Sequence, residues 1–142
     1  MRRLTLPLLT ACLAASLSAC SHTPSVPLHR QLGGPEGIQD IVGRTLNRVA
    51  QHPTAGRTFK GVKMPFLVNS VSQYVCKLAD GPCVYEGETM ARAHADLGLQ
   101  GSEFDVMVSV LREELDRAGV SDAAKNELLR RLAPSRRDMV QR

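Results

Sequence analysis

The chain has 142 residues, of which 43% are hydrophobic and 23% are charged, and its formal net charge at neutral pH is +4. This mixture excludes an intrinsically disordered chain, and the length suits one domain. The small positive excess gives no electrostatic reason to expect nucleic acid as a partner. With no Trp, two Tyr and three Phe, the core must be aliphatic unless something other than side chains fills it.

Residues 1–19 are typical of an export signal rather than of a fold. Arg2 and Arg3 form a basic start, an uncharged apolar stretch runs from Leu4 to Leu17, and small residues follow. The sequence Leu-Ser-Ala-Cys that ends at Cys20 resembles the bacterial lipoprotein box, in which the cysteine is lipidated. We therefore expect the mature protein to begin at Cys20 with a net charge of about +2.

A lipidated Cys20 would carry several acyl chains, which anchor a protein stably where one chain is marginal. Ser21 follows it, where an aspartate would favour retention in an inner membrane. We therefore expect an exported, lipid-anchored protein at the outer membrane, facing the periplasm. An ordinary secretory signal that merely contains a cysteine is the alternative. No run of about twenty apolar residues follows Cys20, so no membrane-spanning helix is expected.

The remaining chain shows helical periodicity, with apolar residues three and four apart, and no sustained alternation of period two. We expect a polar, proline-containing tether over residues 20–31 and then one all-α domain over residues 32–142. Its four substantial helices and one short helix are expected at approximately residues 34–52, 65–78, 88–96 (the short one), 102–119 and 121–133.

Turn and capping residues set these boundaries. The segment 54–63 is expected to be irregular, and Asp80-Gly81-Pro82 ends the second helix. Ser102 with Asp105 resembles a capping box, and Gly119 suits a helix C-terminus. Ser121 or Asp122 is expected to cap the last helix, and Pro134 should break or kink it.

Cys76 and Cys83 flank the Asp80-Gly81-Pro82 turn. An exported protein meets an oxidising compartment, where disulfides persist, and a turn can bring two Cα atoms within bridging distance. The sequence therefore allows a disulfide here, with two independent thiols as the alternative. It does not indicate a zinc site, because no other His or Cys lies at zinc-binding spacing.

His94 is the histidine that carries most information. Met90 and Leu97, four residues before and three after it, lie on the same helical face, so the imidazole is expected to point toward the core. Such a histidine can be a hydrogen-bonded core residue or a metal ligand. The paired acidic residues, by contrast, are expected to be solvated surface groups. These are Glu86 and Glu88 in a loop, and Glu113 and Glu114 beside Arg112 and Arg117 on a helix.

A longer pattern connects these features. Leu32-Gly33-Gly34 precedes the first helix, Phe59 follows it, and Gly81-Pro82-Cys83-Val84-Tyr85-Glu86-Gly87 leads to Met90 and His94. In order and spacing, over roughly residues 28–140, the chain resembles a truncated haemoglobin of the first group. The resemblance implies a two-over-two helical sandwich around haem b, with His94 as the proximal ligand of the iron.

The same resemblance places further side chains at the haem. Phe59 would pack on the haem face, and the porphyrin would supply the large apolar body that this aromatic-poor core lacks. The residues expected on the proximal side or haem edge are Met90, Leu99, Phe104, Met107 and Val108. Those expected on the opposite, distal side are Leu46, Leu67 and Val71.

The distal side departs from the family pattern. Where the family usually has a Phe-Tyr pair in its first helix, this chain has Thr45 and Leu46, and Val71 stands where a glutamine is often found. A hydrogen bond to a charged group is worth about 1.5–3 kcal/mol, and O₂ gains more from such a donor than CO does. We therefore expect a lower preference for O₂ over CO than is usual in the family. Thr45, the one nearby hydroxyl, could instead bond to its own helix backbone.

Three functions remain open from the sequence. The first is a haem globin that reversibly binds a diatomic gas, namely O₂, NO or CO. The second is a haem enzyme of the NO dioxygenase or peroxidase kind, which would need an external electron donor because the chain is too short to hold a reductase domain. The third is a haem-free lipoprotein that uses the globin scaffold for binding or structure.

Overall fold

The structure is a computed structural model that describes residues 26–141. The expected export signal, Cys20 and Ser21 lie outside the described residues. Within this range every regular element is helical, as predicted. The elements are α1 (Leu28–Gln31), α2 (Gly34–Ala50), the 3-10 helix η1 (Ala55–Phe59), α3 (Met64–Leu78), α4 (Met90–His94), α5 (Gly101–Arg117), α6 (Asp122–Leu132) and α7 (Ser135–Met139).

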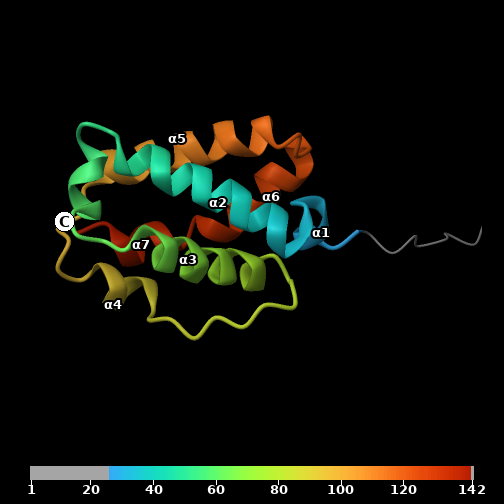
Figure 1. Cartoon of the computed structure of the whole chain (residues 1–142), viewed down its shortest axis with the longest axis horizontal. Coiled ribbons are helices and arrows are strands. Elements are labelled where there is room, and N and C mark those ends of the chain that lie inside the picture. The colour runs from blue at the N-terminus through green and yellow to red at the C-terminus, as the bar shows by residue number, and fades with distance from the viewer. Residues whose placement is uncertain (1–25, 142) are drawn as a thin grey trace, which may run out of the picture.

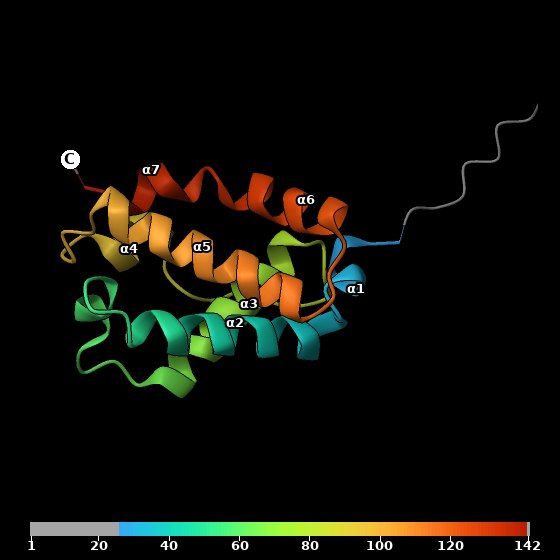
Figure 2. The same cartoon turned by 90° about the horizontal axis from the view of Figure 1, so that it is seen from above.

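The long helices form two pairs that stack on each other (Figures 1 and 2). Helix α2 lies against both α3 and α5, and α3 runs back in the direction opposite to α2. Helices α6 and α7 return along α5 in the same way. This arrangement confirms the two-over-two sandwich that the resemblance implied. The short α4 belongs to neither pair and packs against α7.

An aliphatic core joins the two pairs, because each long helix turns one apolar stripe inward. Its most deeply buried side chains are 0–2% exposed and are Leu32, Ile38, Val49, Cys76, Leu115 and Leu128. Tyr74 and Phe59 pack only at the edge of this core. The prediction of an aliphatic core is therefore confirmed for the part of the chain that the structure describes.

Residues 28–31 were expected in the tether, but they belong to the fold. They form the single turn α1, and the backbone N–H of His29 donates to the carbonyl of Ala79 at 3.0 Å. Leu28 is buried in the core. The physical reason is that Leu28 lies four residues before the buried Leu32, so one helical turn brings both side chains to the same face.

Two helix boundaries follow the predicted chemistry. Ser121 caps α6 by accepting a hydrogen bond from the Ala124 backbone N–H at 3.3 Å. Gly119 has a φ of 71°, and the N–H of Val120 donates to the Leu115 carbonyl at 3.1 Å. This left-handed glycine ends α5 in a Schellman motif.

Other boundary predictions were wrong. Helix α5 begins at Gly101, and its capping box joins Gln100 to Glu103, with the Gln100 N–H donating to the Glu103 carboxylate at 2.8 Å. Ser102 and Asp105 therefore do not form that box. The segment 54–63 contains η1, and the short helix is five residues long. By contrast, the prediction that Pro134 breaks the last helix is confirmed, since α6 ends at Leu132 and the chain resumes as α7 after the proline.

The structure joins Cys76 and Cys83 by a disulfide, with Cα atoms 5.8 Å apart. Gly81 makes the turn between them possible. Its N–H donates to the Cys76 carbonyl at 2.8 Å, and a Cβ at this position would lie 2.6 Å from the Cys76 Sγ. Any other residue would therefore collide with the bridge.

Among the described residues, none of the helices combines the length and the apolar character needed to cross a membrane.

Candidate functional site

A cavity of about 250 Å³ lies where α4 faces the ends of α2, α3 and α5, and His94 is part of its wall. The volume is just below the roughly 300–1,000 Å³ that is usual for ligand pockets. The lining is mainly apolar. It consists of Val49, Ala55, Thr58, Phe59, Val62, Leu67, Ala93, His94, Leu97, Leu99, Glu103, Phe104, Met107 and Met139.

The ring of His94 is held by its own helix. Its Nδ1 lies 2.7 Å from the carbonyl oxygen of Met90. Because a carbonyl can only accept, Nδ1 must carry the proton, and in the neutral imidazole the lone pair is then on Nε2. Within the described part of the chain Nε2 has no hydrogen-bond partner, so it is available as a metal ligand.

The other polar side chains of the cavity wall are already engaged. The Thr58 hydroxyl donates to the Ala55 carbonyl at 3.1 Å, and Glu103 is paired with Arg57. Thr45, expected from the sequence as the nearby hydroxyl, is buried and donates to the Ile41 carbonyl at 2.8 Å. It does not line the cavity, because its side chain folds back on its own helix.

Six of the ten side chains predicted at the haem line this cavity: Phe59, Leu67, His94, Leu99, Phe104 and Met107. The other four do not. Leu46 is buried in the core, Val71 packs against that core, Met90 supplies the carbonyl that accepts from His94, and Val108 has no place in the lining. Contact of these ten residues with a haem stays a prediction.

Several lining residues were missed from the sequence. Leu97 could have been found, since it lies three residues after His94 on the same helical face. Ala93 had no such signal, because one step along a helix turns the side chain by about 100°. Met139 had no such signal, because it is more than forty residues away along the chain and reaches the cavity only through the packing of α7 beside α4.

An ion pair closes one edge of the cavity. Arg57 donates to both carboxylate oxygens of Glu103, at 2.6 and 2.7 Å, and also to the carbonyls of Leu97 and Gly98. Glu103 is only 3% exposed. The hydrogen bonds from Arg57 outweigh burial and hold the pKa of Glu103 below its ordinary value. Arg57 thereby ties η1 to the segment that joins α4 to α5.

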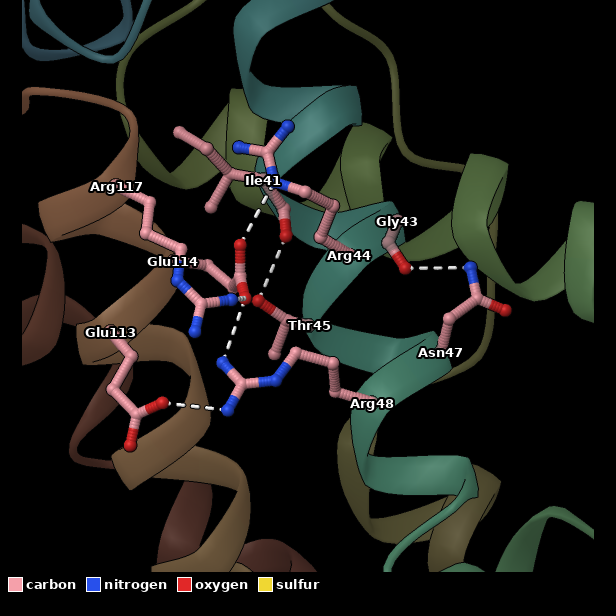
Figure 3. Close-up of polar contacts among 9 residues, drawn as sticks. All are labelled: Ile41, Gly43, Arg44, Thr45, Asn47, Arg48, Glu113, Glu114 and Arg117. Atoms are coloured by element: carbon pink, nitrogen blue, oxygen red, sulfur yellow. Dashed lines mark hydrogen bonds and ion pairs between the residues drawn. The ribbon is translucent and has the colours of Figure 1, made fainter.

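Away from the cavity, the expectation that Glu113 and Glu114 are both solvated is wrong for Glu114. Its side chain is fully buried between α5 and α2 and accepts hydrogen bonds from Arg44, Arg48 and Arg117 at 2.7–2.9 Å (Figure 3). Burial is the largest single influence and raises the pKa of Glu114, but the hydrogen bonds from Arg48 and Arg44 and the charges of the arginines together outweigh it, so the pKa is lowered. Glu113, by contrast, remains half-exposed, as predicted.

A wider surface hollow of about 550 Å³ lies over the same cluster on α2. Its charged lining includes Arg44, Arg48 and Arg117, which are engaged by the two glutamates. Because no histidine lines this hollow, whereas the cavity beside α4 holds the available Nε2 of His94, that cavity is the candidate functional site.

Two stacked helix pairs, with a short helix that brings a histidine to an apolar cavity, define a globin of the truncated type. A family model described as bacterial-like globin matches residues 27–141. The group 1 truncated haemoglobin of Tetrahymena pyriformis is 27% identical over 113 residues, which cover 80% of this chain and 93% of that protein. The group 1 truncated haemoglobin of Nostoc commune is 30% identical over 94 residues, 66% of this chain and 80% of that protein.

Solved structures of truncated haemoglobins have a similar fold. The truncated haemoglobin of Tetrahymena pyriformis in its Fe(III) form matches with a TM-score of 0.76, covering 81% of this chain and 98% of that one. The 2/2 haemoglobin of Synechococcus sp. PCC 7002, solved in the cyanomet state with covalently attached haem, has the same TM-score at 23% identity and supports the fold alone. The chain belongs to the bacterial-like globin family, as a truncated haemoglobin of group 1.

Proposed function

We propose that this protein binds haem b through His94 and reversibly binds a diatomic gas, namely O₂, NO or CO. The observation that carries the proposal is the imidazole of His94 in the cavity wall, with Nδ1 fixed to Met90 and Nε2 free. The family supports it, since the similar proteins are truncated haemoglobins.

The residues around the cavity suit a porphyrin. When bound, haem would supply an iron that can bind an imidazole, here that of His94, and a diatomic gas. Phe59, Leu67 and Phe104 offer apolar surface for the macrocycle. A porphyrin needs more room than the present cavity, and Met107 and Met139 are unbranched side chains that repack readily around such a body.

The gas-binding side is proposed to be apolar. Leu67 lines the cavity, while Leu46 and Val71 lie in or against the core beside it. The hydroxyls of Thr45 and Thr58 are both committed to backbone carbonyls. No side-chain donor in the described lining is therefore free to hydrogen-bond a gas ligand, which supports a low preference for O₂ over CO.

The test is haem uptake by the purified protein. Titration with haemin should give one equivalent of bound haem and a sharp Soret band. His94→Gly should lose this spectrum, and added imidazole should restore it, because the free ligand can enter the space left by the side chain. The proposal fails if the unsubstituted protein takes up no stoichiometric haem, or if His94→Gly keeps the same spectrum without imidazole.

We also propose that the protein is exported and anchored by lipid on Cys20, at the outer membrane facing the periplasm. The disulfide between Cys76 and Cys83 supports an oxidising compartment. Cys20→Ala should abolish incorporation of labelled palmitate, and Ser21→Asp should move the protein to the inner-membrane fraction. Unchanged labelling in Cys20→Ala would contradict the anchor, and unchanged fractionation of Ser21→Asp would contradict the sorting.

A further inference from the structure

Helix α4, which carries His94, is held weakly by its own side chains. It has five residues, and none of them is buried. At its start, Thr89 accepts a hydrogen bond from the Arg92 backbone at 3.3 Å, and the ion pair between Glu88 and Arg92 is exposed on both sides. A helix of one turn is not stable by itself. Other parts of the chain must therefore hold it in place.

Gln141, the second-last residue of the chain, makes contacts with the end of α4. Its side-chain amide donates to the carbonyl of His94 at 3.0 Å and to the carbonyl of Ala95. Its backbone N–H donates to the carbonyl of Leu99 at 3.1 Å. The last carbonyls of a helix have no partner within the helix. The His94 carbonyl also accepts from the nearby Leu97 N–H at 3.2 Å, and Gln141 adds to this C-terminal cap of α4 from a distant part of the chain.

Gln141 can act in this way because the segment before it is fixed to the body of the protein. The hydroxyl of Ser135, at the start of α7, lies 3.1 Å from that of Tyr74 on α3. Arg136 pairs with Asp105 and stacks over the ring of Phe104 at 5.1 Å. Figure 1 shows α7 and α4 on the same side of the molecule.

We propose that Gln141 is a positioning residue for the haem ligand, in that it holds α4 and thereby sets where the Nε2 of His94 lies. The reason is that the His94 ring is held rigidly on α4. The Nδ1 of the His94 ring is hydrogen-bonded to the Met90 carbonyl of the same helix. The position of α4 therefore determines the position of Nε2. This positioning role rests on the proposed function, since it assumes that His94 binds the iron.

The first measurement is hydrogen exchange of the backbone amides of residues 88–97 in the full chain, both as purified and after saturation with haemin. Gln141→Ala should raise their exchange rate about fivefold, the factor that corresponds to one net hydrogen bond. Gln141→Glu, which keeps the shape but cannot donate, should do the same. Gln39→Ala, at an exposed glutamine on α2, is the matched control and should change nothing there.

The second measurement is the iron–histidine stretching band of the ferrous haem protein in the resonance Raman spectrum. Gln141→Ala and Gln141→Glu should shift or broaden this band while the thermal unfolding midpoint stays close to that of Gln39→Ala. A merely structural role would lower the midpoint and leave the band in place.

The two measurements distinguish failure of the positioning role from failure of the proposed function. Unchanged exchange over residues 88–97 in both Gln141 variants overturns the proposal, and so does faster exchange with an unshifted band. If the unsubstituted protein binds no haem, the proposed function fails and the positioning role fails with it. The exchange data would still show whether Gln141 holds α4.

Discussion

Glu113 and Glu114 are adjacent on α5, but their side chains lie in very different surroundings. Glu113 and Glu114 both pair with Arg48, at 2.6 and 2.7 Å, but the Glu113 side chain is 50% exposed and that of Glu114 is fully buried. One step along a helix turns the side chain by about 100°, which moves it from solvent to the contact with α2. Glu114 then depends on its arginines to offset the cost of burying a charge.

Removing the charge of Glu114 should therefore cost more than removing that of Glu113. We expect Glu114→Gln to lower the free energy of unfolding by about 1–3 kcal/mol, because charge-assisted hydrogen bonds to arginines are lost in a buried place. Glu113→Gln, the control on the adjacent exposed residue, should change it by less than about 1 kcal/mol. Urea unfolding of both variants measures the difference, and equal effects would show that the burial of Glu114 is irrelevant.

Leu67 offers the most direct test of the apolar gas-binding side, because it lines the cavity and comes from α3. Leu67→Gln introduces an amide donor, and we expect it to slow O₂ release about tenfold, the factor for roughly 1.4 kcal/mol of hydrogen bonding. CO release should change much less. Leu67→Met is the apolar control. Laser-flash and stopped-flow kinetics of the ferrous protein give both rates, and equal slowing for O₂ and CO would exclude a hydrogen bond as the cause.

The connection from α3 to α4, which leads to the helix of His94, is long and contains no regular secondary structure. The disulfide fastens its first part to α3, and the Tyr85 hydroxyl donates to the carbonyl of Glu88 at 2.6 Å near its end. Tyr85 also packs edge-on against Tyr74, with ring centroids 5.3 Å apart. The path of the chain into the helix of His94 is thus set by covalent and aromatic contacts rather than by secondary structure.

We expect the doubly substituted protein Cys76→Ala, Cys83→Ala to lose about 2–3 kcal/mol of unfolding free energy, the value for a closed loop of this length. Urea unfolding measures the loss. Reduction of the unsubstituted protein should give a similar loss, whereas reductant should leave the double variant unchanged. A reductant effect on the double variant would show that the bridge is not the group responsible.

The helices themselves were largely predictable, because their signals are local. The start of α6 at Ser121 and the end of α5 at Gly119 depend only on residues within one turn. The start of α5 was misplaced because two capping pairs overlap in the sequence. The structure uses Gln100 with Glu103, whose carboxylate also serves the distant Arg57.

Across the molecule, arginines lower the pKa of several glutamates below the ordinary value. Hydrogen bonds from Arg130 and Arg131 lower the pKa of Glu127 to about 2, and those from Arg57 lower the pKa of Glu103. Glu114 behaves in the same way through Arg48 and Arg44, against the effect of burial. Each of these carboxylates binds its proton more weakly in the folded than in the unfolded chain.

The folded protein should therefore lose stability in acid. Above the ordinary glutamate pKa of about 4.3 the full contribution of these carboxylates is present. As the pH falls from there toward 2, the unfolded chain takes up protons first and the unfolding free energy declines. Urea unfolding across this range should show the decline, with a shallower slope for Glu103→Gln. A pH-independent unfolding free energy between 5 and 2.5 would contradict these shifts.

Features that depend on neighbours along the chain were predictable: the helical class, most helix limits, the turn between Cys76 and Cys83, and the inward face of His94. Which side chains meet across the fold was not predictable, because it depends on how the helices pack. The tertiary structure buried Glu114 where α5 meets α2, kept Leu46 in the core and outside the cavity, and brought Gln141 to the end of α4. These contacts are long-range, since a helical repeat or a cap acts over four residues, whereas Glu114 meets α2 and Gln141 meets the end of α4 across 46 to 70 residues of chain.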